Sequence, residues 1–578
     1  MSCKTDATTV AEEREFGSAV PDSATVQEHP DPAPVLPEPA QDTLADRVRR
    51  AALSRPEHPA LLWHDQMVTW AELDARVDAV AAVLLRSVPP DSAGRPGRVA
   101  IALPNSPDFA VAFFGILRAG LVAVPVNPDF TAREFRHVLG DSGAALLLCT
   151  GAVRDRLDGI RAELPDLAEI HVGLPQADRV ATDESVTDES ADRSAADGFE
   201  LAVLLYTSGT EGRPKGAMLS HRALLANHEQ IGRIEPPVVG PDDVVLLALP
   251  LFHAYGLNSG LGAVAYHGAS GVLVERFDPG DTLATIARHH VTAVLGVPSM
   301  YVGWSLLADS VPAGGESAGG FDVGEAMTSV RVAVCGAAPL DPTTATRFTE
   351  ATRHPVFVGY GLTETAPVLT STLASPLPKA DSIGRPIPGV EVRLVGAGGT
   401  ALWQDGWSDA DEEDEFDLDL PASGSDPGQV VVRGANLFSG YWPDGRGGPD
   451  ADGWWRTGDI AYADADGDLY LVDRLGDLIL VSGFNVYPQE VEQVLSAHPG
   501  VAEAAVVGIP HPYTGQTVKA YLVRAAGSEV TAEDVLGHCE RNLARFKCPT
   551  AVEFVATLPH SAAGKVRKTL LRPEAPDA

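Results

Sequence analysis

The chain has 578 residues, which is too long for one ordinary hydrophobic core, so the sequence predicts several domains. Apolar residues make up 45% and charged residues 21% of the chain, a composition typical of a globular protein and not of a disordered one. The 79 acidic against 43 basic residues give a net charge of −36, which argues against general charge attraction to nucleic acid or to anionic membranes.

The N-terminal segment, residues 1–43, is predicted to be a disordered tail. It is polar and rich in proline ("HPDPAPVLPEPAQ") and lacks the apolar core of a secretory signal. No run in the chain approaches the roughly 18 uninterrupted apolar residues of a membrane-spanning helix. The five cysteines lack metal-ligand spacing, and their odd number is typical of reduced thiols. We therefore expect a cytoplasmic protein without a transmembrane segment or a structural zinc site.

Strands and helices alternate after the tail. Apolar residues from Leu44 to Leu85 have helical spacing, "RVAIALPNS" (98–106) is typical of a buried strand, and residues 109–128 continue as a helix and a strand. This alternation predicts a largely parallel α/β architecture, in which ligands gather at the carboxyl ends of the strands. Further strands are predicted within 144–150, 243–256, 291–301 and 330–340.

The pattern changes at about residue 476. Short strands at 502–510 and 518–525 and two helices, near 488–497 and 531–545, predict a compact unit of about a hundred residues, a natural size for a small domain. The predicted organisation is therefore a tail (1–43), a large domain (44–475) and a small domain (476–578). Two acidic low-complexity stretches, 177–198 and 405–428, are typical of solvated loops or insertions, and we assign them no chemistry.

A polar loop interrupts the apolar stretch "LLYTSGTEGRPKGAMLSH" (204–221). Its small side chains, hydroxyl donors and single lysine suit a polyphosphate. The sequence is not that of the common nucleotide loop, in which Ser or Thr follows the lysine directly, because Gly216 follows Lys215 here. An ordinary Gly/Ser-rich surface turn is the alternative. The candidate phosphate ligands are Thr207, Ser208, Gly209, Thr210 and Lys215.

Two further turns carry isolated carboxylates. In "GYGLTETAP" (359–367), Glu364 can supply the hard oxygen ligand that Mg²⁺ prefers, and Tyr360 can stack on a flat base. A helix N-cap formed by Thr363 or Glu364 is the alternative. In "GWWRTGDIA" (453–461), Asp459 can accept hydrogen bonds from two ribose hydroxyls, although an Asp in an ordinary β-turn would also fit.

The C-terminal part adds two basic candidates. Arg474 begins the segment 472–492, which continues as an apolar strand, a turn and a helix start at Pro488. Lys565 follows Gly564 in "LPHSAAGKVRKTLLR" (558–572), and a surface lysine is the alternative there.

With these motifs in this order, residues 44–573 resemble the adenylate-forming superfamily, which contains acyl-CoA synthetases, adenylation domains of peptide synthetases and firefly luciferases. The resemblance implies a large N-terminal domain with mixed, mostly parallel sheets flanked by helices, and a small mobile α+β C-terminal domain. It also implies two half reactions. A carboxylate attacks the α-phosphorus of ATP and releases pyrophosphate, and a thiol then displaces AMP from the acyl-adenylate.

The resemblance also assigns roles by motif match. It implies that the polar loop holds the β- and γ-phosphates, that Thr363 contacts the α-phosphate, and that Glu364 binds Mg²⁺. Lys565 would be a mobile cation that stabilises charge as the carboxylate meets the α-phosphate. The remaining nucleotide contacts would come from Gly336 and Ala337 of "CGAAP" with Tyr360 and Gly361 around adenine, and from Asp459 with Arg474 at the ribose.

The acid-binding region is less defined. His253 in "PLFHAYG" matches an aromatic or histidine gate between the carboxylate pocket and the thiol entrance, with a hydrogen-bonded core histidine as the alternative. Glycine and alanine at helical intervals in 257–269 leave room for an apolar acyl tunnel, although close helix packing explains them equally. Two residues depart from the family pattern: Glu211, where a hydroxyl residue is usual, and Gly476 at the expected hinge.

We therefore predict an ATP-dependent acyl-CoA ligase that uses ATP, Mg²⁺ and CoA and acts on an apolar carboxylic acid, such as a medium- or long-chain fatty acid. Two alternatives keep the adenylation step: loading of an acyl carrier protein, and an aryl acid as substrate. Non-catalytic adenylate binding is disfavoured because the chain retains both Glu364 and Lys565. No nucleic-acid partner is expected.

Overall fold

A computed structural model of the chain describes most residues from Asp42 to Leu571. The described ranges are 42–175, 201–207, 214–309, 322–396, 398–405, 424–474, 479–481, 484–486, 488–511, 515–543, 545–560 and 565–571. The predicted tail up to residue 41, the acidic stretch 177–198 and most of the second acidic stretch lie outside these ranges, as do Glu211 and Gly476.

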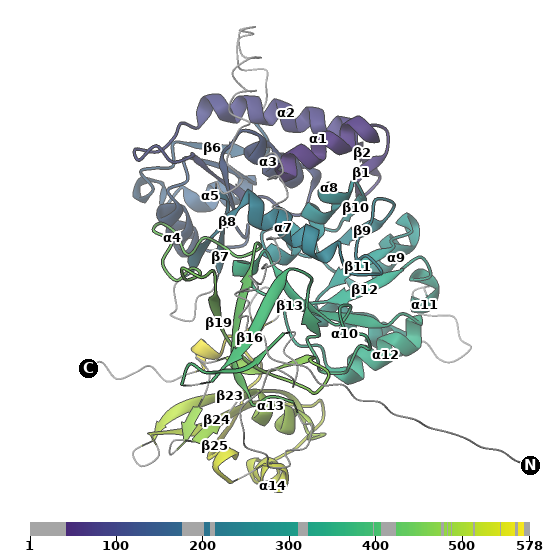
Figure 1. Cartoon of the computed structure of the whole chain (residues 1–578), viewed down its shortest axis with the longest axis vertical. Helices are drawn as coiled ribbons and strands as arrows, with labels where there is room; N and C mark the ends of the chain where they lie inside the picture. Colours follow the sequence, from purple (N-terminus) through teal and green to yellow (C-terminus); the bar gives the residue numbers. More distant parts are fainter. Residues whose placement is uncertain are drawn as a thin grey trace, which may run out of the picture. The chain divides into compact units, whose positions relative to one another are not determined.

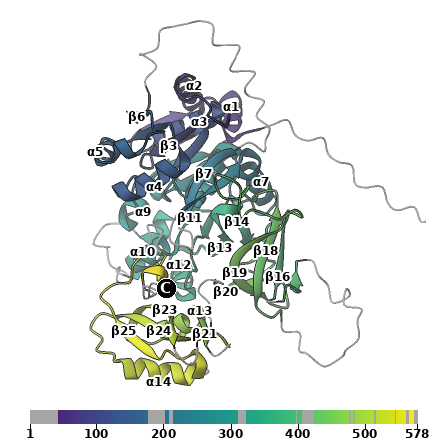
Figure 2. The same cartoon turned by 90° about the vertical axis from the view of Figure 1, so that its left-hand side faces the viewer.

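The first sheet has six strands in the order β6-β5-β3-β4-β7-β8, all parallel except β8, which runs antiparallel to β7. Alternate residues of β3 face opposite sides. Val99 and Ile101 belong to the same hydrophobic cluster as Phe109 and Phe113 of helix α3, whereas Ala102 packs with the cluster that includes α4 and α5. Helices therefore cover both faces, as expected for a parallel sheet (Figure 2). The elements are β3 (Arg98–Ala102), α3 (Pro107–Arg118), β4 (Val122–Pro125), α4 (Ala132–Ser142), β5 (Leu146–Cys149), α5 (Gly151–Leu157), η1 (Arg161–Glu163), β6 (Glu169–Val172), β7 (Leu201–Thr207) and β8 (Lys215–Ser220).

The second sheet has nine strands in the order β15-β14-β13-β12-β11-β9-β10-β1-β2. Its six central strands are parallel, and β2, β14 and β15 are antiparallel additions at the edges. Its strands are β1 (Pro59–Trp63), β2 (Gln66–Thr69), β9 (Val244–Leu247), β10 (Ser270–Leu273), β11 (Ala293–Gly296), β12 (Val332–Cys335), β13 (Val356–Gly361), β14 (Val368–Ser371) and β15 (Arg385–Pro386).

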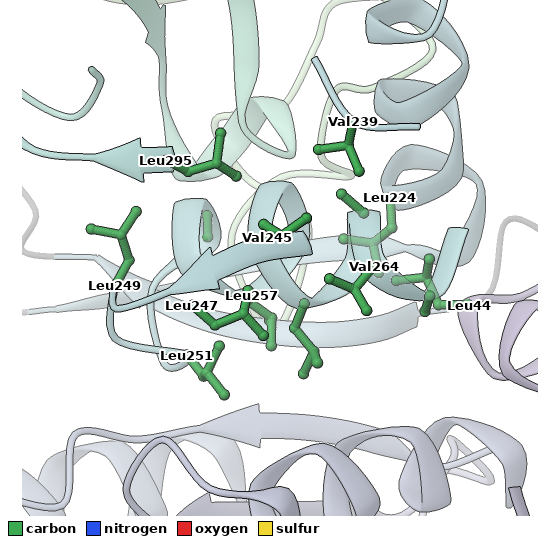
Figure 3. Packing of buried hydrophobic residues seen from close by; sticks show 14 of the residues in the cluster. Leu44, Leu224, Val239, Val245, Leu247, Leu249, Leu251, Leu257, Val264 and Leu295 are labelled. Atoms are coloured by element: carbon green, nitrogen blue, oxygen red, sulfur yellow. The ribbon is translucent and has the colours of Figure 1, made fainter. Parts of the chain in front are cut away.

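Helices follow the strands of the second sheet in the chain, and several of them are visible beside it in Figure 1. They are α7 (His221–Ile231), η3 (Tyr255–Gly262), α8 (Ala263–His267), α9 (Pro279–His289), α10 (Pro298–Asp309), α11 (Val323–Ala326), α12 (Pro342–Thr352) and η4 (Thr363–Thr365). Figure 3 shows how leucine and valine side chains from β9, η3, α7 and α8 gather around strand β9 in the hydrophobic core.

The segment 44–85 differs from the prediction. The helical spacing continues through α1 (Leu44–Ser54) and α2 (Trp70–Ser87), but the β1–β2 hairpin separates the two helices. Pro56 and Pro59 follow α1 closely, and a proline cannot continue a helix because it lacks the amide hydrogen and clashes with the preceding turn. The helical spacing read over 44–85 therefore corresponds to two helices, and the residues between them extend the second sheet.

A third, antiparallel sheet of five strands has the order β17-β16-β18-β19-β20. Its strands are β16 (Val390–Val395), β17 (Ala401–Gln404), β18 (Gly428–Gly434), β19 (Trp455–Ala463) and β20 (Leu469–Arg474). Strands β19 and β20 carry Asp459 and Arg474, which are paired across the ladder.

The C-terminal domain has its own sheet and its own hydrophobic cluster, which includes Ile479, Val491 and Val535. The sheet order is β22-β21-β24-β23, with β25 parallel to β24. Its elements are β21 (Ile479–Val481), β22 (Phe484–Val486), α13 (Pro488–Ser496), β23 (Val501–His511), β24 (Gly515–Arg524), α14 (Ala532–Asn542), η6 (Arg545–Lys547), β25 (Ala551–Phe554) and η7 (Lys568–Leu570). The predicted fold class is thereby confirmed, while the boundary at residue 476 and the mobility of this domain stay predictions.

A helix that spans a bilayer must be both long and apolar. No helix within the described ranges is long and apolar enough to cross a membrane.

Candidate active site

A pocket of about 880 Å³ brings most of the predicted site residues together. This volume is in the range usual for small-molecule sites. The predicted residues that line it are Thr207, Lys215, His253, Gly336, Ala337, Tyr360, Gly361, Thr363, Glu364 and Lys565. Asp459 contacts the pocket through Tyr360, whereas Ser208, Gly209 and Thr210 lie outside the described residues.

The two ends of the predicted phosphate loop are fixed by helix α4. Thr207 and Lys215 are paired in the β7–β8 ladder, so the loop between them closes a hairpin. Beside Thr207, the Tyr206 hydroxyl donates to Asp141 at 2.6 Å, and beside Lys215 the His137 Nε2 lies 2.7 Å from the carbonyl oxygen of Pro214. His137 and Asp141 are one helical turn apart, so a single helix holds both ends.

Glu364 is a buried carboxylate, with only 7% of the residue exposed. The Tyr441 hydroxyl donates a 2.7 Å hydrogen bond to its Oε1, and the Glu364 carbonyl oxygen accepts from the Phe438 amide at 2.9 Å. The Lys215 Nζ lies 5.6 Å from the centre of the Tyr441 ring, so this tyrosine is next to both charges.

The surroundings of Glu364 fit Mg²⁺ better than a metal held wholly by protein. In the described ranges, no three His, Cys, Asp or Glu side chains form a metal-binding group. Mg²⁺ is commonly bound by one or two carboxylates and completes its shell with water and substrate phosphates. A single carboxylate near Lys215, the described end of the predicted phosphate loop, is consistent with such a metal.

Asp459 is almost fully buried, at 3% exposure, and accepts a 2.6 Å hydrogen bond at Oδ2 from the Tyr360 hydroxyl. Its own amide donates to the Thr457 hydroxyl at 3.0 Å. Asp459 lies within strand β19, not in a free turn, which removes the ordinary β-turn as an explanation for this residue.

The residues after strand β12 lie against the Tyr255 ring. A Cβ atom on Gly336 would come within 3.0 Å of that ring, and Ala337 has a positive φ of 69°. At Gly361, a Cβ atom would lie 1.9 Å from the Pro367 carbonyl oxygen, so close backbone approach requires glycine at this position.

His253 and Lys565 are electrostatically coupled. Burial, followed by the positive charge of Lys565, lowers the pKa of His253 to about 4. The buried His253 Nε2 has no hydrogen-bond partner in the part of the chain that the structure describes. The lowered pKa keeps this imidazole neutral near pH 7, and its role as a gate stays a prediction.

Two histidines of helix α7 are also held neutral by burial, and they predict an acid-sensitive stability. Burial lowers the pKa of His221 to about 4 and the pKa of His228 to about 3, against 6.5 for an exposed histidine. The unfolded chain therefore takes up protons first as the pH falls below about 6.5. From pH 7 to pH 5, each imidazole should cost about 2 kcal/mol of unfolding free energy.

Urea unfolding at several pH values between 5 and 7.5 measures this loss. The wild type should be most stable above pH 6.5, and His228→Gln should show a shallower decline toward pH 5. A decline of unchanged slope in this variant would contradict the assignment to His228.

Sequence reasoning missed several residues of the site. Tyr441 and Asp141 carry no motif of their own, and Tyr255 received no role although it lies within "PLFHAYG". The contacts of all three residues join segments far apart in the chain. The aromatic pair in "GYW" (440–442) is the only local signal near Tyr441, and it does not indicate a contact with Glu364.

Comparison with known proteins gives matches over almost the whole chain. The family model "AMP-binding enzyme" matches residues 48–442, and "AMP-binding enzyme C-terminal domain" matches residues 490–565. A "Long-chain-fatty-acid--CoA ligase" of Escherichia coli O6:H1 is 33% identical over 570 residues, which cover 92% of this chain and 94% of the relative. A "Feruloyl-CoA synthase" of Amycolatopsis is 34% identical over 535 residues, covering 91% and 97%. The crystal structure of ATP-bound MatB from Rhodopseudomonas palustris superposes with a TM-score of 0.75 at 30% identity, covering 91% and 98%.

Proposed function

Since this chain belongs to the AMP-binding enzyme family and is an AMP-forming acid–thiol ligase that makes an acyl-AMP and then a CoA thioester, we propose that its acid is a medium- or long-chain fatty acid. The observation that carries this proposal is the pocket, which extends from the predicted nucleotide residues into an apolar region. The apolar part is lined by Ile231, Ile234, Val238, Val239, Leu249 and Leu295. Such a lining favours an acid with a sizeable hydrocarbon part.

We propose the following division of the site, which the pocket lining supports. The loop that ends at Thr207 and Lys215, including Ser208, Gly209 and Thr210, would hold the β- and γ-phosphates, and Thr363 the α-phosphate. Glu364 would bind Mg²⁺, whose positive charge offsets that of the phosphates. Gly336, Ala337, Tyr360 and Gly361 would enclose adenine, Asp459 and Arg474 would bind ribose, Lys565 would act at the reacting atoms, and His253 would separate the acid from the thiol entrance.

The proposed roles follow from the charge balance of the two steps. In the first, a carboxylate oxygen bonds to the α-phosphorus while the bond to pyrophosphate breaks, so two anions must meet. Catalysis of such a step depends mainly on positioning and on positive charge at the developing oxyanions. Lys565 and Lys215 are two of the cationic side chains that line the pocket, and we assign them this role. In the second step, the thiol sulfur bonds to the acyl carbon and AMP leaves.

The acid class has one supported alternative. The relative named as a feruloyl-CoA synthase is as similar to this chain as the fatty-acid relative, so an aryl acid is the second candidate substrate. A carrier-protein thiol in place of CoA is the second candidate acceptor. A reducing, cytoplasmic setting is also proposed, because Cys149, Cys335 and Cys539 are unpaired thiols.

Acid-dependent exchange of labelled pyrophosphate into ATP tests the first step on a panel of fatty, aryl and amino acids. We expect exchange with medium- or long-chain fatty acids, and thioester formation when CoA is added. Faster exchange with aryl acids would replace the fatty-acid proposal, and thioester formation only with a phosphopantetheine-bearing carrier protein would replace CoA as the acceptor.

A further inference from the structure

One wall of the pocket is the face of a continuous helical segment, η3 followed by α8. The lining residues Tyr255, Ser259, Ala263 and His267 are four positions apart, so they share one side of the segment. At a helical rise of about 1.5 Å per residue, the twelve steps from Tyr255 to His267 span about 18 Å. The wall is therefore long enough to line an extended acid from one end to the other.

The two ends of this wall differ in their neighbours. Tyr255 packs against Gly336, and His253, which precedes it, faces the charge of Lys565, so this end belongs to the reacting groups. The other end carries His267, which lies close enough to His228 of helix α7 to affect its ionisation. The His228 ring also stacks on Tyr266 with ring centres 5.0 Å apart. At the end of the segment away from the reacting groups, the pocket lining therefore includes a pair of imidazoles, His228 and His267.

Both imidazoles are uncharged, because burial lowers the pKa of His228 to about 3 and lowers the pKa of His267 as well. Hydrogen bonds fix the tautomer of His228. The Asn258 amide nitrogen donates to the Leu224 and Ala366 carbonyl oxygens, so its Oδ1 must accept from His228 Nε2, at 3.0 Å. His228 Nδ1 is then an acceptor nitrogen.

Ser259 adds an unsatisfied hydroxyl to the same wall. The residue is 92% buried, since only 8% of it is exposed, and its Oγ has no hydrogen-bond partner among the described residues. A buried hydroxyl without a partner is destabilising, whereas a bound ligand that supplies an oxygen would satisfy it. A plain hydrocarbon chain cannot do so.

We propose that the acid carries an uncharged oxygen, as a hydroxyl or keto group, on its hydrocarbon part away from the carboxylate, where the polar groups of this wall, Ser259, His228 and His267, can pair with it. This inference rests on the proposed function, because it concerns the acid bound in the same pocket. The apolar residues of the lining still bind the carbon skeleton between the two polar ends. A second carboxylate is disfavoured, because the described lysines and arginine that line the pocket are Lys215, Lys565 and Arg567, and Arg47, whose charge reaches both imidazoles, is already paired with Asp42 at 2.7 Å.

The test compares acids of equal length with the wild-type enzyme. Thioester formation is measured with dodecanoate, 12-hydroxydodecanoate, 11-oxododecanoate and dodecanedioate. We expect kcat/KM for the hydroxy or keto acid to exceed that for dodecanoate by about tenfold or more, because an unpaired polar group in a pocket discriminates against analogues that lack its partner. Equal or better use of dodecanoate overturns the proposal, and so does a clear preference for dodecanedioate.

Two variants test whether Ser259 and His267 cause the preference for the oxygen-bearing acid. Ser259→Ala and His267→Phe should each reduce the ratio of the two kcat/KM values toward one, mainly by improving use of dodecanoate. Val239→Ala, in the apolar lining, is the matched control and should change both values in parallel. A ratio unchanged in both polar variants would contradict the assignment. If no acid of any class supports pyrophosphate exchange, the proposed function fails; if acids are activated without discrimination, only this inference fails.

Discussion

Replacing Lys565 by alanine should slow formation of the acyl-adenylate by about 10²–10³-fold, the usual cost of losing one group that stabilises an oxyanion in the transition state. The lysine lines the same pocket as Thr207 and Lys215, and its charge reaches His253. It is also exposed and belongs to the C-terminal domain, so its position depends on how that domain is placed over the nucleotide. Pyrophosphate exchange with the best acid measures the effect.

Comparing the two half reactions tests whether Lys565 acts only in adenylation. When acyl-AMP is supplied ready-made, thioester formation should fall far less in Lys565→Ala than adenylation does, because no anion then attacks another anion. Lys568→Ala is the matched control, since Lys568 is three residues away but forms a 2.8 Å ion pair with Glu492. Equal losses in both half reactions, or a comparable loss of exchange in the Lys568 variant, would contradict a direct role for Lys565 in adenylation.

The fold was largely predictable because its signal is local. Apolar runs bounded by Gly, Pro or polar residues indicated the strands that became β3, β5, β9, β11 and β12, and these form the parallel centres of two sheets. The β1–β2 hairpin was missed because two short strands between amphipathic helices leave little periodicity of their own, and pairing with β10, more than 200 residues later, stabilises β1. Local pattern cannot reveal a partner at that distance.

In the candidate site, too, only the features with a local sequence signal could be predicted. Residues within motifs, such as Glu364 and Asp459, could be named from the sequence because glycine turns and isolated carboxylates are local features. The hydrogen bonds that these two carboxylates accept could not be predicted from the sequence. Tyr441 is 77 residues from Glu364, and Tyr360 is 99 residues from Asp459, so each contact exists only after the sheets have assembled.

The Tyr441 contact leads to the second large expected effect. The hydroxyl donates to one carboxylate oxygen of Glu364, and we propose that this bond orients the carboxylate toward Mg²⁺. A residue that orients a metal ligand typically contributes 10- to 100-fold to metal affinity or activity. Tyr441→Phe should therefore reduce pyrophosphate exchange by about 10- to 100-fold, and higher Mg²⁺ concentrations should restore part of the loss.

A thermodynamic cycle separates this orienting role from a general loss of packing. If Tyr441 acts through Glu364, the effects of Tyr441→Phe and Glu364→Gln should be strongly non-additive, because once the carboxylate is gone its hydrogen-bond donor has nothing left to orient. Calorimetric binding of ATP with and without Mg²⁺ gives a readout that does not depend on turnover, and Tyr441→Phe should weaken only the Mg²⁺-dependent part. Tyr462→Phe is the control, since that tyrosine stacks on Tyr470 away from the pocket lining and should change neither measurement. Additive losses in the cycle, with Mg²⁺-dependent binding intact, would show that Tyr441 supports the site only by packing.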